Sequence, residues 1–384
     1  MTAEDGGPGR RRQAEITWRR GSDTSLVETG IPANPQSRRP HIGDHRARTL
    51  LRKVESKAYW AASAPVLACL PAALGYRIAC WRGDLLFRAQ AVQRIELADN
   101  VRFVLGNELS PAATQHVVRD WFRLASCNVV DVKRLRHGAR PLRRLVEIRG
   151  REHLEAALAA GKGAILCSAH FGSVTSGISV LHASGFPVTH IGRWDWNYKV
   201  GLSSAERWFW DRVYAKPVLR YRQQPNIEPW PGRPQVAALA ATALRANEVV
   251  TILIDAPLIN DSDRARAIEV PFLGRRAGLL AGAVALAQIT GAPLLMGFVY
   301  RAADYRHQVW EISAPMAVEG ETATAFGRCA AEVSAAIRRS PAHWDLWDTA
   351  DLANLGLIPP QEDGSLAAGP VLPETGDPYK LGSR

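Results

Sequence analysis

The chain has 384 residues, of which 47% are hydrophobic and 22% are charged. This composition is typical of a globular protein with a large core, and it excludes a fibrous or mostly disordered chain. The formal net charge of +11 indicates anionic surroundings such as phospholipid headgroups, phosphorylated substrates, an acidic carrier protein or nucleic acid. The 5 cysteines are dispersed and form no CxxC pair, which predicts reduced structural thiols in a cytoplasmic setting.

Residues 1–55 are rich in Arg, Gly, Pro and Ser and lack apolar periodicity, so we expect a disordered basic arm. Residues 1–8 carry acids and glycines instead of a basic start and an apolar core, so no export signal is expected. Residues 58–76 contain no charge and have about the length of a membrane span. Pro65 and Pro71 interrupt this segment, which leaves three alternatives: a membrane span, a helix at the membrane surface, and a core helix.

Apolar residues at helical spacing continue to about residue 137, and Ser110-Pro111 is typical of a helix start. From residue 146 onward, segments with strand and helix patterns alternate. The expected strands are 146–148, 164–168, 187–192, 249–254, 293–300 and 307–313, and the expected helices are 152–160, 173–184, 234–246, 278–290 and 322–338. This alternation predicts an α/β fold with a mixed, mostly parallel sheet flanked by helices and preceded by an N-terminal helical region.

The same patterns predict how the chain is divided. We expect residues 56–145 to form a helical, membrane-associating region and residues 146–350 to form the α/β core. Residues 351–384 are rich in Pro and Gly and are expected to be an unpacked tail.

His170 follows the apolar run 164–167 and precedes a segment that opens a helix, so we expect it between a strand end and a helix N-terminus. Neutral imidazole is suited to taking a proton near pH 7, and the unpaired N–H groups of a helix N-terminus favour negative charge. The sequence therefore predicts a general base beside an anion site, with a structural histidine as the alternative. Phe171, Gly172 and Ser173 are the candidate substrate-binding residues of this junction.

Five blocks of sequence between residues 70 and 347 stand in the order typical of one known family. They are ELADNVR at 96–102 with LSP at 109–111, RGREHL at 149–154 with GKG at 161–163, the block from Asp255 to EVPFLGR at 269–275, TGAP at 290–293, and SPAHW at 340–344. Through them the chain resembles the lipid A late acyltransferase (lauroyl/myristoyl type) branch of the lysophospholipid acyltransferase superfamily. The resemblance implies an acyltransferase with a glycerol-3-phosphate acyltransferase-like fold.

The resemblance also implies that His170 is catalytic. In this family the histidine of an HX4D/E motif deprotonates the acceptor hydroxyl or amine, and the acid five positions later orients it. Here that position is Thr175, whose hydroxyl can accept from imidazole but supplies no charge. The first candidate for the missing carboxylate is Glu269, because related bacterial mannoside acyltransferases carry a glutamate just before a Phe-Phe-Gly element. The second is Asp255, which ends a buried strand at the sheet edge.

A third alternative is a catalytically degenerate, lipid-binding and membrane-associated partner built on the same fold, with Thr175 as its mark. Arg193 matches the family's arginine block and is a candidate ligand of a phosphate or headgroup. Gly274 and Arg275 are candidates for binding an anionic acceptor or the phosphopantetheine phosphate of a donor.

The resemblance implies an acyl carrier protein or acyl-coenzyme A as donor and an amphipathic lipid or glycolipid as acceptor. It further implies the cytoplasmic face of the cell inner membrane, with the protein peripheral or N-terminally anchored. We expect no metal, no tightly bound cofactor and no nucleic-acid partner, because the sequence carries no metal cluster and no recognisable nucleic-acid module. The acceptor stays open among a lipid A precursor, a glycosylated phosphatidylinositol, a lysophospholipid and a secondary metabolite.

Overall fold

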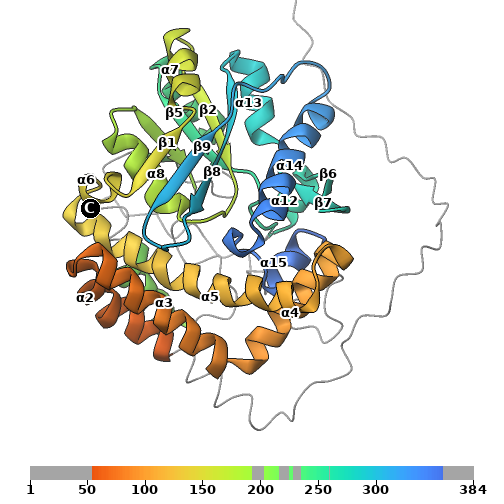
Figure 1. The fold of residues 1–384 in the computed structure, drawn as a ribbon. Coiled ribbons are helices and arrows are strands. Elements are labelled where there is room, and N and C mark those ends of the chain that lie inside the picture. Colours follow the sequence, from red (N-terminus) through yellow and green to blue (C-terminus); the bar gives the residue numbers. More distant parts are fainter. Residues whose placement is uncertain (1–53, 193–202, 216–224, 228–234, 259, 358–384) are drawn as a thin grey trace, which may run out of the picture. The chain divides into compact units, whose positions relative to one another are not determined.

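The computed structural model describes residues 54–192, 203–215, 225–227, 235–258 and 260–357. Within them a seven-stranded sheet has the order β1-β9-β8-β2-β5-β3-β4, with only the β8–β9 pair antiparallel (Figure 1). Helices flank this sheet and precede it, so the expected α/β fold is confirmed. The strands are β1 (Val146–Arg149), β2 (Ala164–Ser168), β3 (Val188–Ile191), β4 (Asn226–Ile227), β5 (Val249–Leu253), β8 (Leu294–Arg301) and β9 (Gln308–Ile312).

The two faces of the sheet carry separate apolar clusters. Strand β2 is buried at every position, as expected of a central strand in a parallel sheet. Ala164 and Leu166 belong to the cluster with α7 and α8, whereas Ile165 and Cys167 belong to the cluster with α11, α13 and α14. The side chains of β2 thus pack alternately against the helices on the two faces of the sheet. These helices are α7 (Arg151–Ala159), α8 (Val174–Ala183), α11 (Gln235–Arg245), α13 (Gly282–Thr290) and α14 (Thr322–Arg339), and shorter ones are α6 (Arg140–Arg143), α9 (Ser204–Trp210), α12 (Asp261–Arg266) and α15 (Thr349–Asn354).

The helical region before the sheet consists mainly of α2 (Ala64–Cys69), α3 (Ala72–Ala89), α4 (Ala91–Leu105) and α5 (Pro111–Arg134). Helix α5 begins at the expected place, because Ser110 Oγ accepts a hydrogen bond from the backbone N–H of Ala113 at 3.2 Å. Further along α5, the Asn128 side chain donates to the carbonyl of Gly172 at 3.2 Å. Helix α5 therefore contacts the turn that follows β2 (Figure 1).

Residues 58–76, for which three alternatives were open, do not form one continuous helix. A π-helical turn (Tyr59–Ser63) leads into α2, the backbone is extended at Leu70, and α3 starts after Pro71. Among the helices of the described ranges, none combines the length and the apolar character that crossing a bilayer requires. Tyr59 and Tyr76 are buried in a cluster shared with α5, whereas Val66 and Leu74 are exposed.

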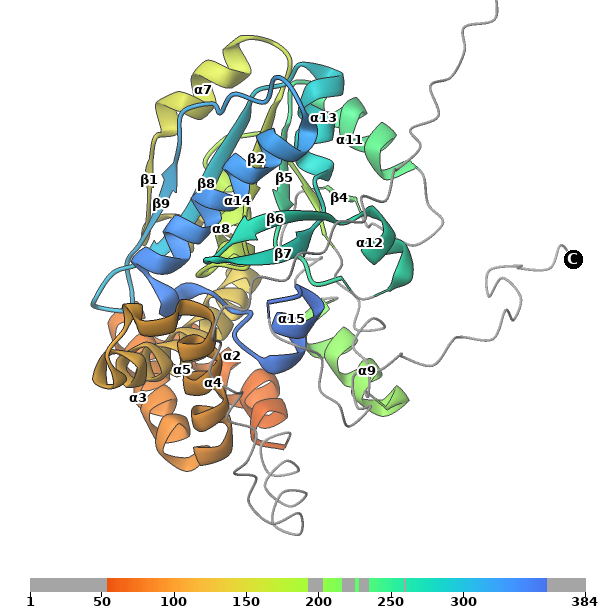
Figure 2. The same cartoon turned by 90° about the vertical axis from the view of Figure 1, so that its right-hand side faces the viewer.

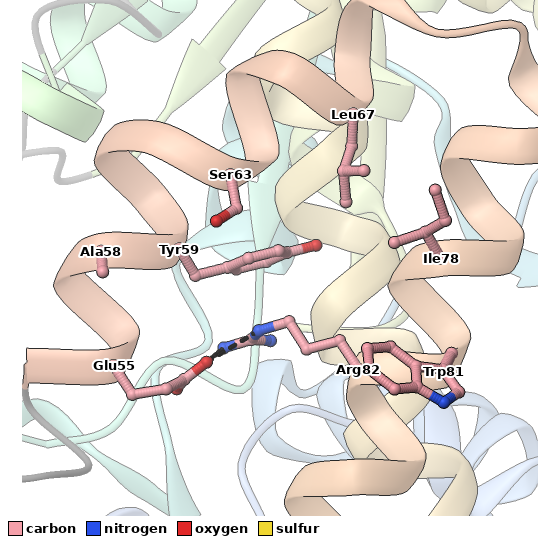
Figure 3. Close-up of a pocket in the computed structure, with 8 residues that line it drawn as sticks. All are labelled: Glu55, Ala58, Tyr59, Ser63, Leu67, Ile78, Trp81 and Arg82. Carbon is pink, nitrogen blue, oxygen red and sulfur yellow. Dashed lines mark hydrogen bonds and ion pairs between the residues drawn. The ribbon is translucent and has the colours of Figure 1, made fainter.

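A cavity of about 280 Å³ lies between these first helices (Figure 3). The Arg82 guanidinium lies 3.5 Å from the centre of the Tyr59 ring and donates to Glu55. Trp81, which also lines the cavity, is 66% exposed. The remaining lining residues are Ala58, Ser63, Leu67 and Ile78. The cavity is therefore mostly apolar and open beside an exposed indole.

A buried polar network joins α3 and α5 to the sheet. Asp131 of α5 forms an ion pair with Arg301 of β8, and the two side chains are 0% and 1% exposed. Tyr76 of α3 donates to the same carboxylate, and so does Gln308 of β9 at 3.1 Å. Burial and the charge of Asp131 raise the pKa of Tyr76 well above its ordinary value, so this phenol remains a donor.

The expected helix 278–290 is wrong at its start. Residues 278 and 279 belong to a hairpin of β6 (Ile268–Phe272) and β7 (Arg275–Leu279), and α13 begins only at Gly282. The hairpin lies beside α14 in Figure 2. Its two turn residues, Leu273 and Gly274, have φ values of 54° and 79°, as a type I′ turn requires. Leucine is not a turn-forming residue, so local sequence patterns contain little sign of this turn.

Candidate active site

Two side chains meet at the carboxyl edge of the sheet. Strands β2 and β5 are parallel neighbours, and their last residues, Ser168 and Leu253, are paired in register. His170 follows β2 and Asp255 follows β5, so both side chains emerge at the same edge. The N–H of Ile254 donates to the Ser168 carbonyl at 3.0 Å, which continues the pairing up to Asp255.

Asp255 contacts His170 through both the ring and the backbone. Its Oδ1 lies 2.8 Å from His170 Nδ1, and the backbone N–H of His170 lies 3.0 Å from Oδ1 and 2.9 Å from Oδ2. Because an ionised carboxylate only accepts, Nδ1 carries the hydrogen and Nε2 keeps its lone pair. Among the described residues Nε2 has no hydrogen-bond partner, and the His170 side chain is 34% exposed while Asp255 is fully buried.

The charges around His170 favour its protonated form. Desolvation is the largest single effect and lowers the pKa of His170, but the carboxylates of Asp255, Asp345 and Asp351 together raise it above its ordinary value. Desolvation also raises the pKa of Asp345 to about 7, with Asp255 and Asp351 adding to the rise and His170 opposing it, although the Asp345 side chain remains exposed to solvent. The nearby carboxylates therefore stabilise the imidazolium that forms when the ring takes a proton.

Gly172 makes the turn between β2 and α8 possible. Its φ is +60°, and a Cβ atom at this position would lie 2.0 Å from the carbonyl oxygen of Val299. Its N–H donates to the His343 carbonyl at 2.7 Å. Phe171 next to it is completely buried, and its ring stacks on the His343 ring with centroids 5.3 Å apart. Phe171 and Gly172 therefore hold the turn in place by packing and backbone contacts.

Ser173 and Thr175 lie at the start of α8. Ser173 is 4% exposed and Ser176 is 2% exposed, and within the described residues neither hydroxyl has a hydrogen-bond partner. Thr175 is half-buried, and its carbonyl accepts a bond from Ser179 at 3.5 Å. The first turn of α8 thus combines a helix N-terminus with two unpaired buried hydroxyls, while the bond to the His170 ring comes from Asp255.

The other predicted site residues lie elsewhere or outside the described residues. Glu269 is 69% exposed on β6 and pairs with Arg276 at 3.0 Å. Gly274 forms the hairpin turn, and Arg275 donates to the Phe103 carbonyl with its guanidinium 4.0 Å from the Phe103 ring centre. Arg193 lies outside the described residues. Of the two candidate carboxylates, Asp255 is therefore the one that contacts His170.

Sequence reasoning missed two residues of this site, Trp344 and His343. The indole N–H of Trp344 donates to Asp255 Oδ2 at 2.8 Å. His343 Nε2 accepts from the backbone N–H of Arg301 at 2.9 Å, and burial followed by the charge of Arg301 lowers the pKa of His343 to about 4. The block SPAHW at 340–344 was the available signal, because it places both residues in a segment typical of the family.

Within the described ranges, no group of three or more His, Cys, Asp or Glu side chains is arranged to hold a metal ion. The contact between His170 and Asp255 offers proton transfer by an imidazole that a buried carboxylate orients.

The sequence model of the bacterial lipid A biosynthesis acyltransferase family matches residues 48–347. The chain belongs to this family. The matched range spans the helical region, the sheet and the segment that carries Trp344, and it confirms the resemblance seen in the five sequence blocks. The comparison with curated proteins gave no match.

As a member of the lipid A biosynthesis acyltransferase family, the protein is an acyltransferase that acts on a lipid-like acceptor. Its transferred group is an acyl group other than an aminoacyl group. Thr175 stands where the family motif has an acid. In this chain the carboxylate that contacts His170 is instead that of Asp255, which follows the neighbouring strand β5.

Proposed function

We propose that the protein transfers a fatty acyl group from an acyl carrier protein or coenzyme A thioester to a hydroxyl or amine of a lipid or glycolipid, with His170 as general base. The observation that supports this most directly is the 2.8 Å contact between His170 Nδ1 and the buried carboxylate of Asp255. It leaves Nε2 as the basic atom. It also argues against a degenerate protein, because the oriented imidazole is retained despite Thr175.

The reaction proceeds by proton transfer and acyl exchange. Nε2 of His170 takes the proton from the acceptor, whose oxygen or nitrogen attacks the thioester carbonyl carbon. The C–S bond then breaks, and the imidazolium returns the proton to the leaving thiolate sulfur. Asp255 stabilises the imidazolium formed in between, and such general-base catalysis contributes about 100-fold to 10,000-fold.

The oxyanion of this reaction needs donors next to His170. The N–H groups of Phe171 and Gly172 already bind the carbonyls of Ala169 and His343, so they are occupied. The proposed donors are instead the backbone N–H groups in the first turn of α8, together with the buried Ser173 hydroxyl. A helix N-terminus is suited to this role because its N–H groups point toward developing negative charge.

The proposal includes a location at the cytoplasmic face of the cell inner membrane. Support comes from exposed apolar side chains on the first helices. Leu74, Trp81 and Leu85 are 47%, 66% and 48% exposed, and their spacing places them on one side of α3. Arg77 and Arg88 are exposed on the same helix. Apolar side chains flanked by arginines are typical of a helix that lies on an anionic lipid surface.

An acyl-transfer assay tests the mechanism. Radiolabelled palmitoyl-coenzyme A and palmitoyl-acyl carrier protein are each offered with a lipid A precursor, a phosphatidylinositol mannoside and a lysophospholipid. The donor and acceptor pair with the highest turnover is then used for variants. We expect His170→Ala to lose at least about 100-fold in kcat with its fold intact. Turnover unchanged by this substitution would remove His170 from the mechanism.

Glu269→Gln tests the other candidate carboxylate in the same assay. If Asp255 is the partner of His170, the exposed Glu269 contributes little to kcat. A loss in Glu269→Gln equal to that in Asp255→Asn would contradict the choice of Asp255.

A further inference from the structure

We propose that Trp344 is a positioning residue for the His170–Asp255 pair, and that its indole N–H fixes the carboxylate in the orientation that binds the ring. The inference rests on the proposed function and extends it to the segment between α14 and α15. It concerns how the base is held, since Trp344 contacts Asp255 and not the reacting atoms.

The hydrogen bonds of Asp255 show why the indole matters. Oδ1 accepts a hydrogen bond from the ring Nδ1 of His170 at 2.8 Å. The backbone N–H of His170 is shared between Oδ1 and Oδ2. The only other donor to Asp255 among the described residues is Trp344 Nε1, at 2.8 Å from Oδ2. Because Asp255 is 0% exposed, water does not replace a missing donor at its surface. Removing the indole N–H leaves Oδ2 with a shared backbone bond alone.

The backbone around Trp344 holds His170 from the other side. Phe171 and Trp344 form an antiparallel bridge. On one flank the N–H of Gly172 donates to His343 at 2.7 Å, and on the other the N–H of Asp345 donates to the His170 carbonyl at 2.9 Å. The same short segment thus fixes both the backbone of the base and the carboxylate that orients its ring.

Trp344 is itself held rigidly. Its side chain is 0% exposed, its ring packs edge-on against Trp347 with centroids 4.8 Å apart, and Phe272 of the hairpin lies 6.0 Å away. A donor with so little freedom restricts the rotation of the carboxylate that it binds.

The chain contains a matched control for this indole. Trp347 is also buried, at 1% exposed, and its N–H donates at 2.8 Å to the carbonyl of Pro341 instead of to Asp255. Trp344→Phe and Trp347→Phe therefore remove the same group from the same cluster. Only the first of them changes the hydrogen bonding of Asp255.

Two measurements on the full-length chain test the proposal. The first is kcat and KM with the donor and acceptor pair chosen above. We expect Trp344→Phe to lower kcat by about 10-fold to 100-fold with KM within about twofold, and Trp347→Phe to keep kcat within about twofold. The second is the titration of the His170 ring by ¹H–¹⁵N NMR, assigned by its absence in His170→Ala. We expect a lower midpoint in Trp344→Phe than in the wild type and in Trp347→Phe, because a carboxylate that turns away from the ring stabilises the imidazolium less.

Equal kcat in the two variants, or a His170 midpoint in Trp344→Phe that is not below the wild-type value, would overturn the positioning role. Thermal unfolding is measured for both variants. Because both lose a buried indole, a loss of stability should be similar in the two, whereas a loss in kcat that comes from positioning should appear only in Trp344→Phe. The failure of this proposal differs from the failure of the proposed function. An inactive His170→Ala with equal tryptophan variants refutes only Trp344, whereas an active His170→Ala refutes the base itself.

Discussion

At the scale of single residues, the proposed mechanism requires a carboxylate at His170 Nδ1, and the chain places one there across two strands. An acid one helical turn after the histidine would reach the ring from α8, where this chain has Thr175. Asp255 reaches the same nitrogen from the end of β5 at 2.8 Å. Ring orientation and charge depend on this contact and not on the sequence distance between the partners, so the relocated acid can perform the same role.

Replacing Asp255 by Asn removes the charge and keeps the shape. We expect kcat to fall by about 100-fold to 10,000-fold, because the imidazolium loses its stabilising partner. The pKa of His170 is raised in the native protein because nearby carboxylates outweigh desolvation, and without Asp255 the desolvation effect remains. The pKa therefore falls, and since the base acts when neutral, the acid limb of kcat/KM moves to lower pH. A pH series from 4.5 to 8.5 at low substrate, about two units on either side of an unperturbed histidine, measures both the loss in rate and the shift of the acid limb.

The control is a second His–Asp pair on the loop after β8. His307 Nδ1 lies 2.6 Å from Asp304 Oδ2, and both side chains are more than 40% exposed, at 48% and 42%. Asp304→Asn removes an equivalent contact that has no part in the site, so we expect kcat and the pH profile of the wild type. A profile of Asp255→Asn that matches that of Asp304→Asn would show that the buried carboxylate does not set the pKa of the base.

The sequence predicted His170 but did not decide between its possible partners. The position of His170 follows from local signals, a buried strand followed by a helix start. The choice of Asp255 depends on the pairing of β2 with β5, which are about 80 residues apart and adjacent only in the sheet. The donor role of Trp344 was equally hidden, because no local pattern reveals which acid an indole in a distant segment will reach.

At the scale of elements, the junction between β2 and α8 depends on one glycine. Gly172→Ala combines a positive φ of 60° with a Cβ atom 2.0 Å from the Val299 carbonyl, so we expect a loss of about 3 kcal/mol or more in the free energy of unfolding. Urea unfolding followed by tryptophan fluorescence measures this loss. The acyl-transfer activity of any folded fraction should also fall, because the turn carries His170.

Gly161→Ala separates the cost of a left-handed backbone conformation from the cost of a steric clash with a neighbouring atom. Gly161 has a similar φ of 72°, but no atom of the described residues lies within 4 Å of the place that an alanine Cβ would occupy. We expect this variant to lose only about 1 kcal/mol, the cost of a left-handed conformation for alanine. Equal losses in the two glycine variants would contradict the close approach between Gly172 and Val299.

Elements with a clear periodicity were predicted almost to the residue, and those without it were missed. Strand 164–168 coincides with β2, and helix 322–338 differs from α14 by one residue. The β6–β7 hairpin was missed because Gly278 and Leu279 sit in an apolar run that also fits a helix, and because the turn starts with a leucine. Short strands that pair with each other outside the main sheet give a weak sequence signal.

At the scale of the whole molecule, the exposed apolar residues are unevenly distributed. Of the nine large apolar side chains that are exposed in the described residues, six lie between residues 54 and 95. The net charge of the full chain is +11. An uneven apolar surface on a basic protein favours attachment to anionic lipid, which is where the proposed function places the lipid-like acceptor.

Vesicle sedimentation tests this attachment. We expect the protein to bind vesicles of phosphatidylethanolamine and phosphatidylglycerol more tightly than vesicles of phosphatidylcholine, and the difference to shrink at high salt. The double variant Trp81→Asp with Leu85→Asp should bind at least about 10-fold more weakly, because each side chain loses about 1.5–3 kcal/mol of apolar burial. Ile289→Asp is the matched control, since Ile289 is 81% exposed on α13. If α3 contacts the lipid, only the substitutions on α3 should weaken vesicle binding. Equal losses of vesicle binding in the double variant and in the control would therefore rule out α3 as the lipid-contacting helix.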